Sequence, residues 1–244
     1  MNRHLLFPVL LAALLSLSPA SSMAGFLNDV MKNITVPPAA TAKLDDATVV
    51  KGLKEALATG TANAVASVSQ TDGYFGNQLI KITMPDKLRA AAALLNKFGF
   101  RQDVDEFVLA MNRAAEKAAP KAKKHFIAAL HAMTIEDAQK ILQGGNTSAT
   151  EYFRDKTSKT LFEEFKPVVS SSLQNVGAVQ SYRQMAESFK SIPYAGTLAD
   201  ADLDNYVTAK AVDGLFAMIG AEEKKIRTDP AARGTELLQK VFAK

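Results

Sequence analysis

The sequence predicts an all-α fold, a compact bundle of roughly nine or ten helices with little or no strand. From Asp45 onward, alanine, leucine, lysine and glutamate are plentiful and β-branched runs are scarce, while aromatic residues make up only 7% of the chain. Within 103–119, apolar residues recur at steps of three and four, which places them on one face of a helix. These residues are Val104, Phe107, Val108, Met111, Ala114, Ala115 and Ala118.

Breakers and capping residues divide the chain into its elements. Pro85 and Pro120 suit the first turns of helices, Thr134 with Asp137 resembles a capping box, and Gly144-Gly145 ends a helix. Asp72-Gly73 and Gly76 indicate a loop at 71–77, and 79–83 fits a short extended piece. The expected helices are 26–34, 46–68, 85–97, 103–119, 120–133, 134–144, 148–175, 178–191, 202–228 and 235–242.

The first 24 residues have the pattern of a signal peptide. Arg3 is followed by an apolar run at 5–17, and the small residues Ser22 and Ala24 favour cleavage before Gly25. The run is too short for a membrane span, which needs about 20 apolar residues. We therefore expect a signal peptide at 1–24, an N-terminal segment with a Pro-containing linker at 25–44, and a single helical domain at 45–244.

The amino-acid composition limits the cellular locations and the kinds of partner that we expect for the protein. The chain has no cysteine, so disulfides, thiolate metal sites and a lipid anchor are not expected. A bacterial periplasm fits best. The formal net charge of +4 is spread without long runs, so nucleic acid is not an implied partner. No second apolar stretch reaches spanning length, so no membrane span is expected, and the sequence does not indicate an oligomeric state.

Several long strings resemble one bacterial family. They are MNRAAEKAAPKAKK at 111–124, MTIEDAQKIL at 133–142, ATEYF at 149–153, YVTAKAVDGLF at 206–216 and EEKKIRTDPAAR at 222–233. Over about Asp45 to Phe242 the chain is similar to the bacterial domain-of-unknown-function family 4197. The resemblance implies an exported, helical bacterial protein, and it brings no activity, ligand or catalytic residue with it.

The motifs of common catalytic and metal sites are missing from the sequence. There is no Gly-x-Ser-x-Gly and no His-x-x-x-His, and a cysteine nucleophile is impossible. His125 and His131 are six residues apart on one expected helix, so they do not share a face. We expect both at the surface or half-buried, and we expect neither a metal site nor a cofactor.

The helix at 202–228 carries the first group of candidate site residues. Tyr206, Lys210 and Asp213 fall within about 60° of one another on a helical wheel, and Lys210 and Asp213 can pair at i, i+3. The favoured interpretation is a narrow solvent face or an ion pair that fixes packing. The alternative is that the phenol and the ammonium meet a ligand while Asp213 sets the charge.

Two further groups are weaker candidates. Arg113 and Glu116 lie with Asn112 and Lys117 on the polar side of the helix at 103–119, where Arg113 suits a carboxylate or phosphate, although a solvated face is favoured. Tyr74 and Phe75 sit between glycines in the loop. They mark a binding surface or fold back into the core, and the second interpretation is favoured.

These observations favour a non-enzymatic binding or interaction protein, for an apolar or amphipathic ligand or an envelope partner. One alternative is an enzyme that uses the Asp/Lys/Tyr face of 202–228, and another is a structural envelope component without a small ligand. A cavity lined only by apolar side chains supports binding. A cavity where Lys210 and Asp213 meet Arg113 or Glu116 supports chemistry, and a fully packed interior supports a structural role.

Overall fold

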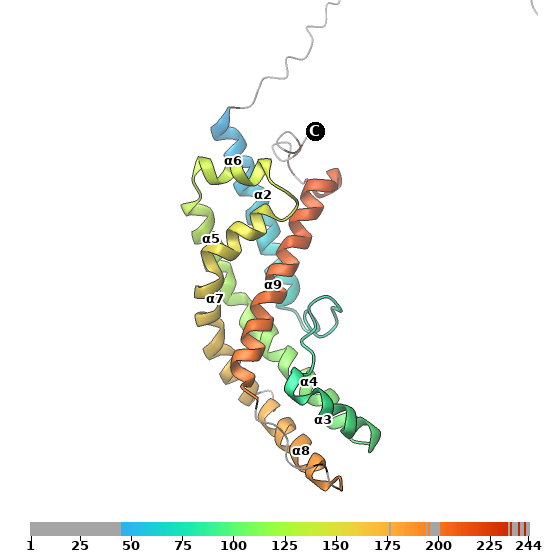
Figure 1. Cartoon of the computed structure of the whole chain (residues 1–244). Coiled ribbons are helices and arrows are strands. Elements are labelled where there is room, and N and C mark those ends of the chain that lie inside the picture. Colours follow the sequence, from blue (N-terminus) through green and yellow to red (C-terminus); the bar gives the residue numbers. More distant parts are fainter. Residues whose placement is uncertain are drawn as a thin grey trace, which may run out of the picture. The chain divides into compact units, whose positions relative to one another are not determined.

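The computed structural model describes residues 45–175, 177–193, 195, 201–233, 235, 239 and 242. Within these ranges the chain is helical and holds no strand, so the predicted all-α class is confirmed (Figure 1). The α-helices are α2 (Asp46–Val68), α3 (Asp86–Lys97), α4 (Arg101–Ala118), α5 (Ala122–Ala132), α6 (Ile135–Gln143), α7 (Ser148–Asn175), α8 (Ala178–Ser191) and α9 (Leu203–Thr228). Two 3-10 turns, η1 (Ala119–Lys121) and η2 (Pro230–Ala232), complete them.

The described residues hold eight α-helices rather than the nine or ten expected for the whole chain. The expected helix at 26–34 lies outside them, together with the signal peptide and linker at 1–44. Of the expected helix at 235–242, only residues 235, 239 and 242 are described. None of the helices described is both long and apolar enough to cross a membrane.

Local sequence signals set several helix ends. The Asp45 side chain accepts a hydrogen bond from the Thr48 amide at 2.7 Å and caps α2. Thr134 and Asp137 form the predicted capping box at the start of α6. The expected extended piece at 79–83 is not a strand: a turn runs through 78–80 and the chain is irregular from 81 to 85.

Helix α9 lies at the centre of the packing, in contact with α2, α4 and α7 (Figure 1). Its Phe216 ring meets Phe126 of α5 at a centroid distance of 6.1 Å, and Phe126 meets Phe153 of α7 at 5.4 Å. Both ring pairs are edge-to-face, the geometry that aromatic quadrupoles favour. All three rings are buried, so they tie three helices into one core.

A buried carboxylate joins the ends of two helices. Glu223 of α9 is 4% exposed and accepts hydrogen bonds from the amides of Ala149 and Thr150, at 2.9 and 2.8 Å. These amides are among the first of α7 and have no carbonyl partner within their own helix. Arg227 pairs with Glu223 at 2.9 Å and donates to the Ile141 carbonyl of α6 at 2.8 Å. The N-terminal cap of α7 is thus provided by a side chain of another helix, Glu223 of α9.

Candidate functional site

The candidate site is built around loop 69–85, the 17 residues between Val68 and Asp86 that join α2 to α3. The structure brings every candidate residue of the sequence to this loop, within it or against it. Two lie in the loop, two on α4 hold it from one side, and three on α9 line a groove with it. They are Tyr74 and Phe75, Arg113 and Glu116, and Tyr206, Lys210 and Asp213.

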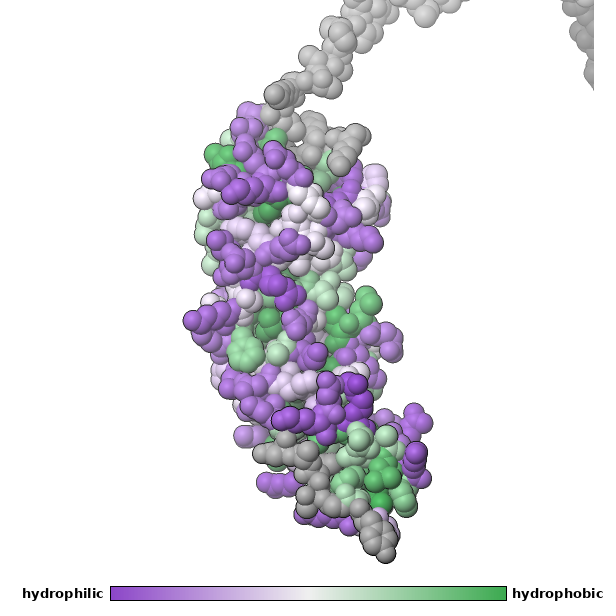
Figure 2. All heavy atoms as spheres, viewed as in Figure 1, coloured by the Kyte–Doolittle hydropathy of each residue, from purple (hydrophilic) through white to green (hydrophobic). Residues whose placement is uncertain are grey.

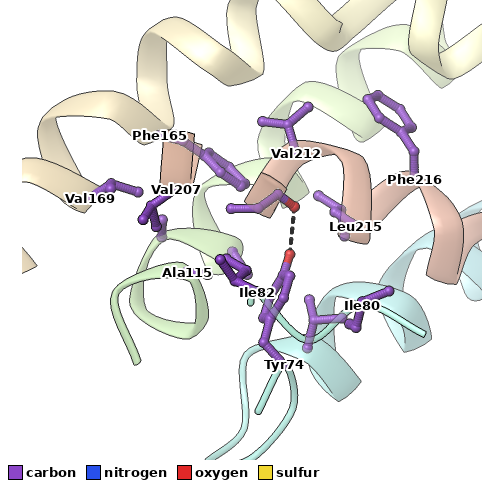
Figure 3. Packing of buried hydrophobic residues seen from close by; sticks show 14 of the residues in the cluster. Tyr74, Ile80, Ile82, Ala115, Phe165, Val169, Val207, Val212, Leu215 and Phe216 are labelled. Carbon is purple, nitrogen blue, oxygen red and sulfur yellow. Dashed lines mark hydrogen bonds between the residues drawn. The ribbon is translucent and has the colours of Figure 1, made fainter. Parts of the chain in front are cut away.

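Tyr74 anchors the loop to the centre of the fold. Its side chain is wholly buried and points from the loop toward α9, where its hydroxyl donates to the Ala211 carbonyl at 2.6 Å (Figure 3). Burial raises the pKa of Tyr74 far above its usual value, with a smaller contribution from Glu116, so the phenol stays protonated. Its neighbour Phe75 is half-buried, with the Lys81 ammonium 3.9 Å from its ring centroid.

Glu116 holds the same turn of the loop from α4. Its Oε1 accepts from the amides of Tyr74 and Phe75, at 3.1 and 3.3 Å, and its Oε2 accepts from Arg113 at 2.7 Å. Arg113 also reaches Asp72 at 2.7 Å. Burial lowers the pKa of Arg113, but the bonds to Glu116 and Asp72 outweigh it and the net shift is upward. The predicted solvated face is therefore wrong for Glu116, which is only 4% exposed because the loop covers it.

Asn112 fixes the second part of the loop. Its side-chain amide accepts from the Ile82 amide and donates to the Ile82 carbonyl, both at 2.8 Å. One side chain thus supplies both hydrogen bonds that a neighbouring strand would give Ile82. Asn112 is fully buried, so it too departs from the expected solvated face.

The α9 candidates border a groove of about 280 Å³ between 79–83 and α9. Tyr206 donates its hydroxyl proton to the Thr83 carbonyl at 3.0 Å, and burial raises its pKa. Lys210 and Asp213 are exposed. The groove has polar residues along α9, and Gly214 also lines it. Its volume lies close to the lower end of the 300–1,000 Å³ range that is typical of ligand pockets.

Lys210 and Asp213 do not pair with each other, and both are exposed, so of the two favoured interpretations the structure agrees with a solvent face rather than an ion pair between them. Asp213 pairs instead with Arg154 of α7 at 3.0 Å, because α7 packs along α9 and brings the guanidinium within reach. The Lys210 ammonium lies 5.9 Å from the Tyr206 ring centroid. Arg113 and Glu116 do not line the groove, so the meeting of charges that supports chemistry does not occur there.

The structure has a second groove that the sequence did not predict. It has a volume of about 530 Å³ and lies between α5, the start of α6 and α7. His125 lines it and is half-buried, as expected, but its Nε2 is buried without a hydrogen-bond partner. Burial lowers the pKa of His125, Lys124 adds to the shift and Glu164 opposes it. The lining residues come from three helices, so no spacing along the chain revealed them.

These features define an all-α domain with a central helix and a long loop secured against it. Among the described residues, no group of three or more His, Cys, Asp or Glu side chains is placed to hold a metal ion. The chain belongs to the family described as Protein of unknown function (DUF4197), whose model matches residues 43–243. Neither the curated proteins nor the solved structures contain a match to the chain.

Proposed function

We propose that the protein is an exported, non-enzymatic component of the bacterial envelope that binds a partner protein through loop 69–85 and the adjoining face of α9. The observation that carries this proposal is the length of the loop combined with its anchoring. Loops longer than about 12–15 residues without secondary structure are uncommon in compact domains, and they are usually functional or disordered. This one is held by buried side chains of α4 and by Tyr74.

Such anchoring favours recognition because it removes the entropy that a flexible loop loses on binding. Holding the loop requires burial of Glu116 and Asn112, and a buried polar group is tolerated only when its hydrogen bonds are made. The fixed conformation is therefore better explained by what the loop presents than by the connection alone.

The loop presents an apolar side chain beside charged ones. Leu79 is 84% exposed, the largest value for a large hydrophobic side chain in the described part of the chain. Figure 2 shows hydrophobic residues on the molecular face at the level of this loop, surrounded by hydrophilic ones. Lys210 lies in the same groove and forms no ion pair within the described part of the chain. This chemistry fits a partner that offers an apolar pocket for Leu79 and a carboxylate for Lys210.

Site-specific photo-crosslinking in the native bacterium tests the proposal. A photoreactive residue replaces Gln78, which is exposed beside Leu79. Intact mass first checks that the exported chain starts at Gly25. We expect one discrete protein adduct whose yield falls at least fivefold with Leu79→Asp and also falls with Lys210→Glu, because rim charges steer association.

Ile135→Asp is the matched control, since Ile135 is an exposed aliphatic residue on α6 and its replacement should leave the adduct unchanged. An adduct that persists in the Leu79→Asp variant contradicts the proposal. The absence of any discrete adduct also contradicts it and favours the structural alternative, while retention of residues 1–24 contradicts the export.

A further inference from the structure

The groove between α5, α6 and α7 has the size and lining of a small-molecule site. Its volume of about 530 Å³ lies within the 300–1,000 Å³ range of ligand pockets. Ala128, Ala129 and Ala132 of α5 and Tyr152 of α7 form an apolar wall. The groove shares no lining residue with the groove beside loop 69–85, so it is a separate site.

The apolar wall is fixed before any ligand arrives. The Tyr152 hydroxyl donates to the Ala129 carbonyl at 3.0 Å, so the ring is tied to α5. The buried Thr157 hydroxyl donates to the Phe153 carbonyl at 2.6 Å. Neither hydroxyl therefore requires a partner from a ligand, and the groove is preformed.

The two charged side chains of the groove, Asp137 and Lys156, differ in the interactions that they already make within the protein. The Asp137 carboxylate accepts two hydrogen bonds from Thr134, at 2.8 Å from the hydroxyl and 3.0 Å from the amide, and these bonds lower the pKa of Asp137. Lys156 pairs with its exposed neighbour Asp155 at 3.5 Å, and its charge also helps to lower the pKa of Asp137, but among the described residues it forms no ion pair or hydrogen bond with the Asp137 carboxylate. Exposed pairs of this kind contribute little. The cation therefore remains the more available charge in the groove.

The Lys156 ammonium also lies close to the apolar wall. It is 6.0 Å from the Tyr152 ring centroid, at the limit of a cation–π contact. His125 lines the same groove, and its buried Nε2 has no partner. Buried polar atoms without partners are rare in folded proteins, and a polar ligand group is one way to satisfy them.

We infer that this groove binds a single-chain amphiphile with a carboxylate head group. The chain lies on the alanine and Tyr152 wall and the carboxylate meets the Lys156 ammonium. One available ammonium matches a head group of one negative charge, and the apolar wall matches an alkyl tail. This inference stands independently of the partner proposed for loop 69–85.

Isothermal titration calorimetry of the mature chain with decanoate tests it, with decanol and decyltrimethylammonium as neutral and cationic counterparts. We expect decanoate to bind most tightly. Lys156→Gln should weaken decanoate binding about tenfold, as loss of a charge-assisted hydrogen bond does, and leave decanol unchanged. Lys166→Gln is the matched control, because Lys166 is an exposed lysine of the same helix that does not line the groove.

A second variant fills the groove without touching its charge. Ala132 is exposed on α5, so Ala132→Trp should block decanoate and decanol while the chain still folds. Ala93→Trp on α3 controls for the added indole. The inference is overturned if decanoate does not bind, if the three amphiphiles bind equally, if the cationic one binds best, or if Ala132→Trp has no effect. Leu79→Asp should leave decanoate binding unchanged, which separates this result from the partner test.

Discussion

Single residues decide how closely loop 69–85 approaches α9. A Cβ at Gly214 would lie 2.7 Å from the Tyr74 ring and 3.1 Å from the Ile80 Cβ. Glycine in a helix interior is unfavourable by about 1 kcal/mol relative to alanine. A glycine at position 214 is explained by the Tyr74 ring, which packs against the backbone of α9 there.

Gly214→Ala should therefore lower the free energy of unfolding by about 1–3 kcal/mol, the usual range for an overpacked core. Urea unfolding followed by circular dichroism measures it. Gly220→Ala on the same helix is the control, because its Cβ would meet only ordinary contacts, the nearest at 3.6 Å. That variant should be neutral or more stable. Equal effects of the two substitutions would contradict the packing of Tyr74 against Gly214.

The sequence indicated which helices and which loop carry the candidate residues, but it did not indicate the environments of those residues. A helical wheel places Asn112 and Glu116 outside the apolar stripe of α4, on the side that favours solvent. The wheel contains no information on loop 69–85, whose amides come from 30 to 42 residues away along the chain. Polar side chains that satisfy a distant backbone cannot be told from solvated ones by periodicity alone.

At the level of elements, the cap that α9 provides for α7 depends on one carboxylate, that of Glu223. Glu223→Ala removes the partner of the Ala149 and Thr150 amides and leaves Arg227 without its carboxylate. Breaking a buried pair in this way lowers stability by about 3 kcal/mol. We expect that loss in urea unfolding, and a smaller one for Glu223→Gln, which retains the shape and one acceptor.

Glu222→Ala is the matched control for this cap. Glu222 precedes Glu223 and its side chain is 17% exposed, but among the described residues it pairs only with the exposed Lys225 and caps no helix, so its loss should change stability by no more than about 1 kcal/mol. A Glu223→Ala variant as stable as Glu222→Ala would show that α7 does not depend on α9 for its first turn.

The helices were predictable because their signals are local. Caps such as Thr134 with Asp137 and breakers such as Pro85 lie within a few residues of the ends that they set. The extended piece at 79–83 was harder, since its only strand-like hydrogen bonds come from the Asn112 side chain rather than from another strand.

On the scale of the whole molecule, α9 connects features that the sequence keeps apart. It receives Tyr74 from the loop, pairs with Arg154 of α7 through Asp213, and caps α7 through Glu223. The pairing of Asp213 was not predictable, because a local rule favours Lys210 three residues away and only the packing of α7 on α9 brings Arg154 closer. The groove lined by His125 and Lys156 was missed for the same reason.

The fixed conformation of loop 69–85 is the central claim, and native-state hydrogen exchange tests it most directly. The account predicts that the amides of Tyr74, Phe75 and Ile82 exchange as slowly as the core amides of α4, because each donates to a side chain of that helix. Asn112→Ala should speed exchange at Ile82 far more than at Tyr74. Exchange of all three amides at the rate of an unstructured peptide would contradict the claim.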